Sequence, residues 1–159
     1  MTSNPLPETL ARYFAGPDGT IQRVRLAAYA WCEREDSVLL TRVSAHGPGG
    51  GLWTLPGGGL DFGEDPAAAV TREVDEETGY GIELGDLLGI RSAVLDPGQT
   101  ISGHRVQTVG ILYRGIVAGG DLRLEFEGST DLAAWVPFGE LDRLPSVDLL
   151  SWARALAGR

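Results

Sequence analysis

The chain has 159 residues, of which 43% are hydrophobic, and its formal net charge at pH 7 is −9. This length suits one domain with one core and is too short for two. The acidic balance argues against a protein that wraps a nucleic-acid polymer, since phosphate contacts need clustered basic residues. Neither a long apolar run nor a basic and then apolar N-terminal signal is visible, so we expect a cytoplasmic protein without a membrane partner.

The predicted elements mix strands and helices. Two strands, at 23–32 and 38–43, flank a polar turn and are rich in Val, Leu and aromatic residues. A glycine-rich loop follows at 45–51, and then a short strand at 52–55. The later elements are a helix at 66–78, strands at 82–95, 104–117 and 122–126, turns at 85–86 and 119–120, one or two helical turns at 138–144, and a helix at 147–156. This order places the chain in the mixed α/β (α+β) class.

The helix predicted at 66–78 has well-defined ends. Asp65 can accept hydrogen bonds from the free N–H groups at its start, Pro66 suits the first helical position, and Gly79 favours a stop. One face of the helix has the spacing of a surface that packs on a core, with Ala67, Val70 and Val74. The other face is acidic.

Three carboxylates crowd this acidic face. Glu73, Glu76 and Glu77 fall within one arc of about 100°, because positions i, i+3 and i+4 share a face of a helix. Their mutual repulsion favours a bound cation, and hard divalent ions such as Mg²⁺ prefer oxygen ligands. Arg72 can hold the carboxylate of Glu76 in a fixed rotamer, and Glu64 can contact Arg72 or a metal-bound water. These residues predict a metal site with Arg72 and Glu64 as its structural support.

The spacing of the acidic helix resembles the Nudix box, the signature of the Nudix hydrolase family of MutT-like domains. The matching positions, separated by five, seven, two and one residues, are Gly58, Glu64, Arg72-Glu73, Glu76-Glu77 and Gly79. Tyr80 stands where the family usually has an aliphatic residue, but an aromatic side chain can fill the same buried role. The resemblance implies the Nudix fold, a mixed β-sheet sandwiched between α-helices. It implies a single Nudix hydrolase domain at 23–157, after an N-terminal extension at 1–22.

The resemblance also implies a pyrophosphohydrolase that uses Mg²⁺ or Mn²⁺. Such an enzyme cleaves the diphosphate bond of a nucleoside diphosphate linked to another moiety, as in a nucleotide sugar such as ADP-ribose or a nucleoside triphosphate, by water attack on phosphorus. Its principal metal ligands would be Glu73 and Glu77, with Glu76 a ligand or a base. Some family members take the base from a later loop, where the candidates are Glu127, the first choice, Glu125 and Asp131. The expected catalytic residues are therefore Glu76, Glu77 and Glu127.

A second hypothesis is a Nudix domain that has lost catalysis and acts as a nucleotide-ligand sensor or scaffold. Degenerate domains tend to lose part of the set that this chain keeps intact, which is Glu64, Arg72, Glu73, Glu76 and Glu77. We therefore expect an enzyme. Both hypotheses imply a small-molecule nucleotide as the partner.

Several residues near the box are candidates for substrate binding. Gly57, Gly58 and Gly59 let main-chain groups approach a phosphate, and the Gly58 carbonyl is a metal ligand in some related proteins. Arg42, near the end of the second strand, could reach a phosphate or serve the surface. The aromatic residues that could stack on a base or fill the core are Tyr29, Trp53 and Phe62.

The sequence leaves two features open. The box does not specify the group attached to the diphosphate, and Pro97, 17 residues after Tyr80, is close to but not at the position typical of the ADP-ribose-hydrolysing branch. The apolar helix at 147–156 could serve the core or a homodimer contact, through Leu149, Leu150 and Trp152.

Overall fold

The computed structural model describes residues 22–46, 48–100, 102–125 and 127–159. The predicted N-terminal extension at 1–22 lies outside these residues except for Gln22. The strands are β1 (Arg23–Arg34), β2 (Ser37–Val43), β3 (Trp53–Thr54), β4 (Gly57–Gly59), β5 (Tyr80–Leu95), β6 (Val106–Gly120) and β7 (Thr130–Pro137). The helices are α2 (Pro66–Thr78) and α3 (Asp148–Leu156), with 3-10 turns at Pro97–Gln99 and Phe138–Arg143. No helix in the described ranges has the length and apolar character needed to cross a membrane.

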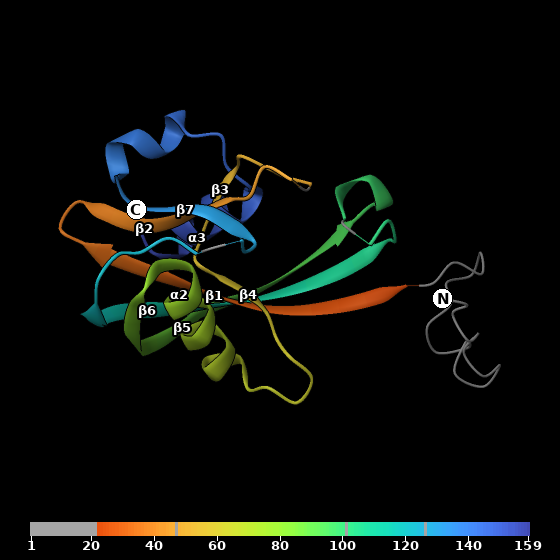
Figure 1. The fold of residues 1–159 in the computed structure, drawn as a ribbon, viewed down its shortest axis with the longest axis horizontal. Helices are drawn as coiled ribbons and strands as arrows, with labels where there is room; N and C mark the ends of the chain where they lie inside the picture. Colours follow the sequence, from red (N-terminus) through yellow and green to blue (C-terminus); the bar gives the residue numbers. More distant parts are fainter. Residues whose placement is uncertain (1–21, 47, 101, 126) are drawn as a thin grey trace.

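The strands pair in one mixed sheet (Figure 1). Its main order is β3-β2-β1-β6-β5, while β4 pairs with β1 and β7 pairs with β2. The long strand β1 connects the two parts: from Arg23 to Cys32 it runs parallel to β6, and at Glu33 and Arg34 it turns antiparallel onto β2. Parallel neighbours need a long connection, and the chain between β1 and β6 supplies it through α2 and β5. The predicted mixed sheet is therefore confirmed.

Helices cover both faces of this sheet. Successive side chains of a strand point to opposite faces, so the contacts of neighbouring residues in β1 show which helix lies on which face. Ala30 and Cys32 of β1 pack in one buried cluster with Val70 of α2. Trp31, between them in the sequence, packs in a second buried cluster with Leu150 of α3. The expected sandwich of a sheet between α-helices is therefore confirmed.

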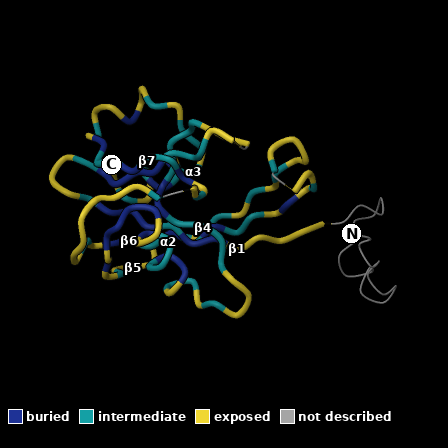
Figure 2. Tube along the Cα trace, in the orientation of Figure 1, coloured by how far each residue is buried: buried dark blue, intermediate teal, exposed yellow. Residues whose placement is uncertain are grey.

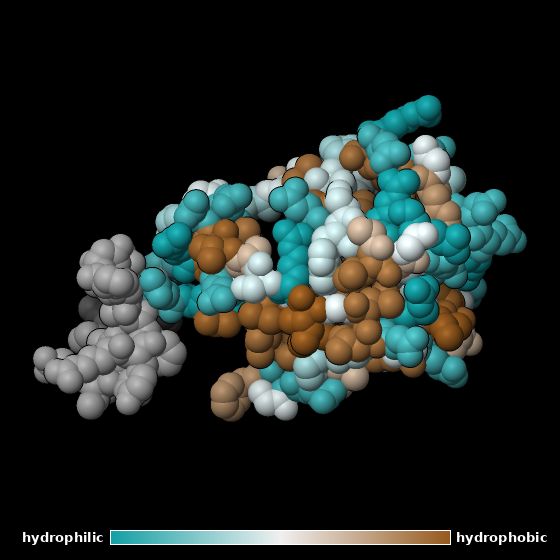
Figure 3. All heavy atoms as spheres, turned by 180° about the vertical axis from the view of Figure 1, so that it is seen from behind, coloured by the Kyte–Doolittle hydropathy of each residue, from teal (hydrophilic) through white to brown (hydrophobic). Residues whose placement is uncertain are grey.

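Two predictions about apolar side chains can be compared with the structure. Tyr80 is buried, and its hydroxyl accepts a hydrogen bond from the indole N–H of Trp135 at 3.2 Å, so an aromatic does fill this position. Leu149 and Trp152 of α3 pack against the second cluster and thus serve the core. Apolar side chains also remain on the surface, and Figure 3 shows a patch of them across the rear face. The homodimer stays a prediction.

Part of the sheet extends beyond the body of the molecule (Figure 1). It combines the start of β1, the start of β6 and the end of β5, which lie in register at Arg25, Thr108 and Ala93. Figure 2 shows that the start of β1 is exposed, whereas the sheet between the two helices is buried. This projecting part is therefore held mainly by strand pairing.

The acidic helix α2 begins and ends at the residues predicted from the sequence, Pro66 and Thr78. Oδ1 of Asp65 accepts a hydrogen bond from the N–H of Ala67 at 2.8 Å and so caps the start. Gly79 has a φ of 78°, the left-handed conformation that favours glycine at the end of a helix. These local contacts fix which residues form the acidic face.

Three local predictions in the second half of the chain are wrong. Residues 85–86 form no turn and lie within β5, where its register with β6 shifts. Residues 119–120 belong to the end of β6. Residues 121–125 form no strand, whereas 130–137 form β7, which local patterning did not predict. The reason is that β7 obtains its partner from β2, far away in the sequence, and local alternation carries no information on such pairing.

Candidate active site

The glycines before the acidic helix form the short strand β4 beside β1. Gly57 has a φ of 138°, and a Cβ there would overlap the carbonyl oxygen of Ala28, so glycine is required. A Cβ on Gly58 would lie 2.6 Å from Oε2 of Glu73. The backbone of β4 therefore lies directly against the carboxylates of α2.

Glu77 is the most buried of the three predicted carboxylate ligands, with 2% of its surface exposed. Its carboxylate accepts hydrogen bonds from the N–H of Gly57 at 2.9 Å and from the hydroxyl of Ser129 at 3.4 Å. Burial raises the pKa of Glu77 to about 8, and the charges of Glu73 and Glu125 add to this rise, while the Gly57 hydrogen bond opposes it. A cation bound here would offset that repulsion.

Arg72 holds the surrounding carboxylates in place. Its guanidinium donates two hydrogen bonds of 2.9 Å to Glu64, one of 2.9 Å to Glu73 and one of 3.3 Å to Glu76. It also donates to the carbonyl oxygen of Gly59 at 3.3 Å. The predicted contact with Glu76 is present, but the paired bonds go to Glu64, whose pKa they lower to about 2. Arg72 thus ties the start of the box to its acidic face.

Glu73 and Glu76 differ in their surroundings. Burial raises the pKa of Glu73, the bond from Arg72 opposes this rise, and the charges of Glu76 and Glu125 add to it. The side chain of Glu76 is 49% exposed. Glu73 is therefore placed between the arginine and β4, while Glu76 faces the solvent.

Among the carboxylates predicted from the later loop, Glu125 interacts with this site. Its carboxylate accepts hydrogen bonds from the backbone N–H and the hydroxyl of Thr130 at 3.2 and 3.1 Å. Its charge raises the pKa of both Glu73 and Glu77. Glu127, the first choice from the sequence, is exposed and has a φ of 55°.

Arg42 and Asp131 bind each other. Nε of Arg42 donates a hydrogen bond to Oδ1 of Asp131 at 2.8 Å, and this bond raises the pKa of Arg42. Both side chains are more than a third exposed. The predicted phosphate contact of Arg42 would have to compete with this ion pair.

The donor set suits a hard divalent cation. Carboxylate and carbonyl oxygens, such as those of Glu73, Glu76, Glu77 and Gly58, are the donors that hard divalent cations prefer. In their present rotamers, no three His, Cys, Asp or Glu side chains of the described residues lie close enough together to hold one metal ion. Binding through all three glutamates would therefore require a change of rotamer on the acidic face, where Arg72 bonds to two of them.

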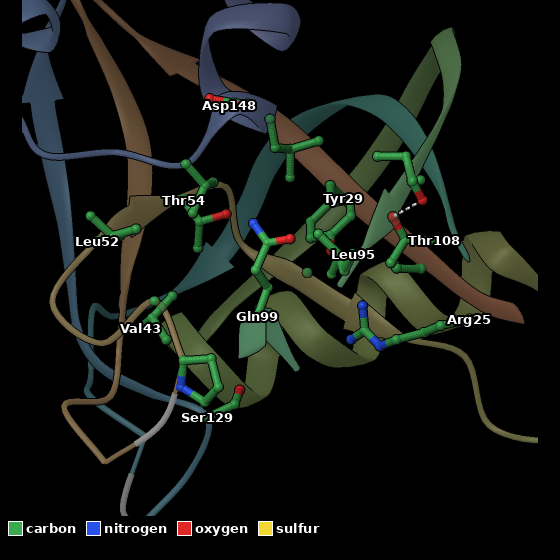
Figure 4. Close-up of a pocket in the computed structure, with 18 of the residues that line it drawn as sticks. Arg25, Tyr29, Val43, Leu52, Thr54, Leu95, Gln99, Thr108, Ser129 and Asp148 are labelled. Atoms are coloured by element: carbon green, nitrogen blue, oxygen red, sulfur yellow. Dashed lines mark hydrogen bonds between the residues drawn. The ribbon is translucent and has the colours of Figure 1, made fainter. Parts of the chain in front are cut away.

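A cavity of about 750 Å³ opens beside Glu77, and Gly57 and Ser129 also line it. Figure 4 shows two facing walls, with Val43, Leu52 and Thr54 on one and Arg25 and Thr108 on the other. Cavities of several hundred Å³ hold small-molecule ligands of nucleotide size. The acidic helix therefore contributes a carboxylate to a space that can hold a nucleotide.

The aromatic candidates lie in different places. Tyr29 lines the cavity, Trp53 packs against the second buried cluster, and Phe62 is fully exposed. Arg25, Arg91 and Gln99 are among the polar lining residues that the sequence pattern did not indicate. Alternation along β1 could have placed Arg25 on the face of Tyr29, but the pairing that brings β5 to the same cavity is not visible in the sequence.

Two features define the class of protein. The glycine strand β4 lies against the glutamate helix α2, whose carboxylates bind Arg72, and the sheet that contains β4 is a mixed sheet between helices. The chain belongs to the NUDIX domain family, whose model matches residues 23–153. The resemblance recognised from the box is confirmed.

Known proteins with similar sequences or structures include phosphoanhydride hydrolases. Diphosphoinositol polyphosphate phosphohydrolase 3-alpha from Homo sapiens is 40% identical over 81 residues, which are 51% of this chain and 47% of that protein. ADP-ribose pyrophosphatase from Methanocaldococcus jannaschii is 34% identical over 115 residues, 72% of this chain and 61% of that protein. A solved MutT NUDIX hydrolase from Burkholderia pseudomallei has a TM-score of 0.65 at 27% identity and covers 85% of this chain and 97% of its own. The chain spans about half the length of the human relative.

Proposed function

We propose that this chain is a metal-dependent pyrophosphohydrolase that cleaves the diphosphate bond of a nucleoside diphosphate linked to another moiety. The observation that carries this proposal is the position of Glu77, which is buried on the acidic face of α2, bonds to the backbone of Gly57 and lines the cavity. Hydrolysis of a diphosphate requires its charge to be neutralised and a water to be activated. The relative named as an ADP-ribose pyrophosphatase supports this class of substrate.

We infer that Mg²⁺ or Mn²⁺ would be held by Glu73, Glu76, Glu77 and the carbonyl of Gly58. When bound, such an ion neutralises phosphate charge and activates water. Arg72 holds Glu64, Glu73 and Glu76 close together through its hydrogen bonds, and a change of rotamer at Glu73 or Glu76 would accompany binding of the ion by all three glutamates. The glycines of β4 have no side chains of their own, which lets a phosphate approach their backbone groups.

We propose Glu125 as the general base, in the role first assigned to Glu127. The two bonds from Thr130 orient the Glu125 carboxylate, and its charge acts on Glu73 and Glu77. An oriented carboxylate next to the ligands can take a proton from an attacking water. The exposed Glu127 lacks these contacts among the described residues.

The test is hydrolysis of ADP-ribose, nucleoside triphosphates and dinucleoside polyphosphates in the presence of Mg²⁺. In ¹⁸O-labelled water, one product phosphate should acquire the label, which identifies the attacked phosphorus. EDTA should abolish the reaction. A panel that contains a tightly bound but uncleaved member would favour the sensor or scaffold hypothesis over the enzyme.

A further inference from the structure

Two arginines that the proposed mechanism does not use line the same cavity. In the projecting sheet, Arg25 of β1 lies in one row with Thr108 and Ala93, and Arg91 of β5 lies in the next row with Ala27 and Gly110. All six residues line the cavity. The residues between the arginines are small, and the ring of Tyr29 lies 3.6 Å from the position of a Cβ on Gly110.

The spacing of the two arginines suits a chain of phosphates. They stand two strands and one row apart on a common face, which places their Cα atoms roughly 12 Å from each other. Arg25 extends from β1 towards the cavity, on the side of Gln99 and Thr108 (Figure 4). Arginine side chains of this length can approach one phosphate chain from both of its sides.

Neither arginine is neutralised by a carboxylate. In the described ranges, the ion pairs within 4.0 Å involve Arg42, Arg72, Arg105, Arg114, Arg123, Arg154 and Arg159. Arg25 and Arg91 take part in none of these pairs. Two unpaired guanidinium groups in one concave site are suited to bind an anion.

We propose that Arg25 and Arg91 form an anion subsite for the phosphate that lies farther from Glu77. This inference rests on the proposed function, because it assigns the attacked phosphate to the Glu77 end of the cavity. The lining holds two arginines and two carboxylates, Glu77 and Asp148. Two cations match a molecule with two or three phosphates, and they are too few for a ring that carries phosphate at most positions. The subsite therefore selects nucleotides over diphosphoinositol polyphosphates.

The first experiment measures binding without metal and without turnover. In EDTA, calorimetry compares ADP-ribose and inorganic pyrophosphate on the wild type, Arg25→Gln, Arg91→Gln and the double variant. Each single change should weaken binding by about tenfold or more, because it removes a charged hydrogen-bond donor. The matched control is Arg23→Gln, which makes the same charge change two residues earlier on β1 and outside the cavity lining, and it should bind like the wild type.

Adenosine, which has no phosphate, serves as the neutral ligand, and its binding should be the same in all variants. Thermal melting verifies that each variant is folded. The subsite is overturned if both arginine variants bind ADP-ribose and pyrophosphate as the wild type does. It is also overturned if neither ligand binds the wild type at millimolar concentration.

The second experiment separates the subsite from the proposed function. With Mg²⁺, Arg25→Gln and Arg91→Gln should raise KM for the best nucleotide of the panel by about tenfold with a smaller change in kcat. The wild type should cleave a diphosphoinositol pentakisphosphate with a kcat/KM about a hundredfold below that nucleotide, and an equal or higher value would refute the selectivity. If the wild type cleaves nothing, the proposed function fails, and the binding experiment still decides the subsite.

Discussion

The carboxylate of Glu77 accepts a hydrogen bond of 2.9 Å from the backbone N–H of Gly57, twenty residues earlier in the chain. This bond joins β4, which contains Gly57, to the last turn of α2, which contains Glu77. Both residues line the cavity. The bond therefore orients the most buried carboxylate of the site towards the space where a substrate would lie.

Replacement of Glu77 by glutamine should abolish metal-dependent phosphate release and leave the chain folded. Glutamine keeps the shape and can still accept from Gly57, but it removes the charge that a divalent cation needs. We expect kcat to fall by about a thousandfold. Phosphate release and far-UV circular dichroism provide the two measurements. The matched control is Glu83→Gln on the exposed part of β5, and unchanged turnover in Glu77→Gln would refute the assignment of the site.

The stability of the metal-free protein should fall as pH rises from about 5 to 8. The folded chain raises the pKa of Glu77 from 4.5 to about 8, so the folded state binds this proton more tightly than the unfolded state does. Between these two pKa values the unfolded chain releases the proton of Glu77, whereas the folded chain keeps it. The free energy of unfolding therefore falls with rising pH until the folded pKa is passed, by on the order of 4 kcal/mol.

Urea unfolding in EDTA between pH 5 and 9 measures this loss. Glu77→Gln should remove most of the slope and be more stable than the wild type at pH 8. The exposed Glu76→Gln should keep the slope. Addition of Mg²⁺ at pH 8 should restore stability to the wild type, because a ligand that binds only the folded state stabilises it. A flat pH profile for the metal-free wild type would contradict the burial of an uncompensated carboxylate.

Gly57→Ala should destabilise the fold strongly. Its φ of 138° is strained for alanine, and the new Cβ would overlap the carbonyl oxygen of Ala28 and approach Tyr29. We expect a loss of about 3 kcal/mol or more, measured by chemical or thermal unfolding. Gly81→Ala is the control, because nothing lies within 4 Å of a Cβ there and its φ is ordinary for other residues. Equal stability of the two variants would show that β4 can shift.

The acidic helix could be predicted from the sequence because its determinants are local. Asp65 caps it, Gly79 ends it, and Glu73 and Glu77 share a face through helical periodicity alone. Most of the strands and helices, whose order gives the fold class, follow in the same way from local periodicity. These features depend on neighbours within about four residues along the chain.

The errors concern features that depend on distant partners. Leu122 and Leu124 alternate as in a strand, but the structure leaves both exposed and without a strand partner in the described part of the chain. Strand alternation does not distinguish Glu125 from Glu127, and only the structure shows the two hydrogen bonds between Glu125 and Thr130. Arg91 reaches the cavity only through the register of β5 on β6. Registers of this kind depend on pairing across the sheet.

Glu125→Gln should lower kcat more than Glu127→Gln does. Thr130 fixes the Glu125 carboxylate with two hydrogen bonds, and the charge of Glu125 acts on the proposed ligands Glu73 and Glu77. A base held in this way contributes about a hundredfold to the rate, so Glu125→Gln should lose about that factor at saturating substrate and Mg²⁺. Glu127→Gln, an identical charge change two residues away on an exposed backbone, is the matched control and should retain wild-type kcat.

The pH dependence of kcat distinguishes a base from a residue that only supports the loop. Loss of a base should remove the acidic limb of the pH profile of kcat, whereas a loosened loop would lower kcat at every pH. Thr130→Val tests the orientation separately, since it removes the 3.1 Å hydroxyl bond and keeps the charge of Glu125. We expect Thr130→Val to reduce kcat by less than Glu125→Gln and to keep the acidic limb. If Glu127→Gln shows the larger loss and Glu125→Gln keeps the limb, the base is Glu127, as the sequence first indicated.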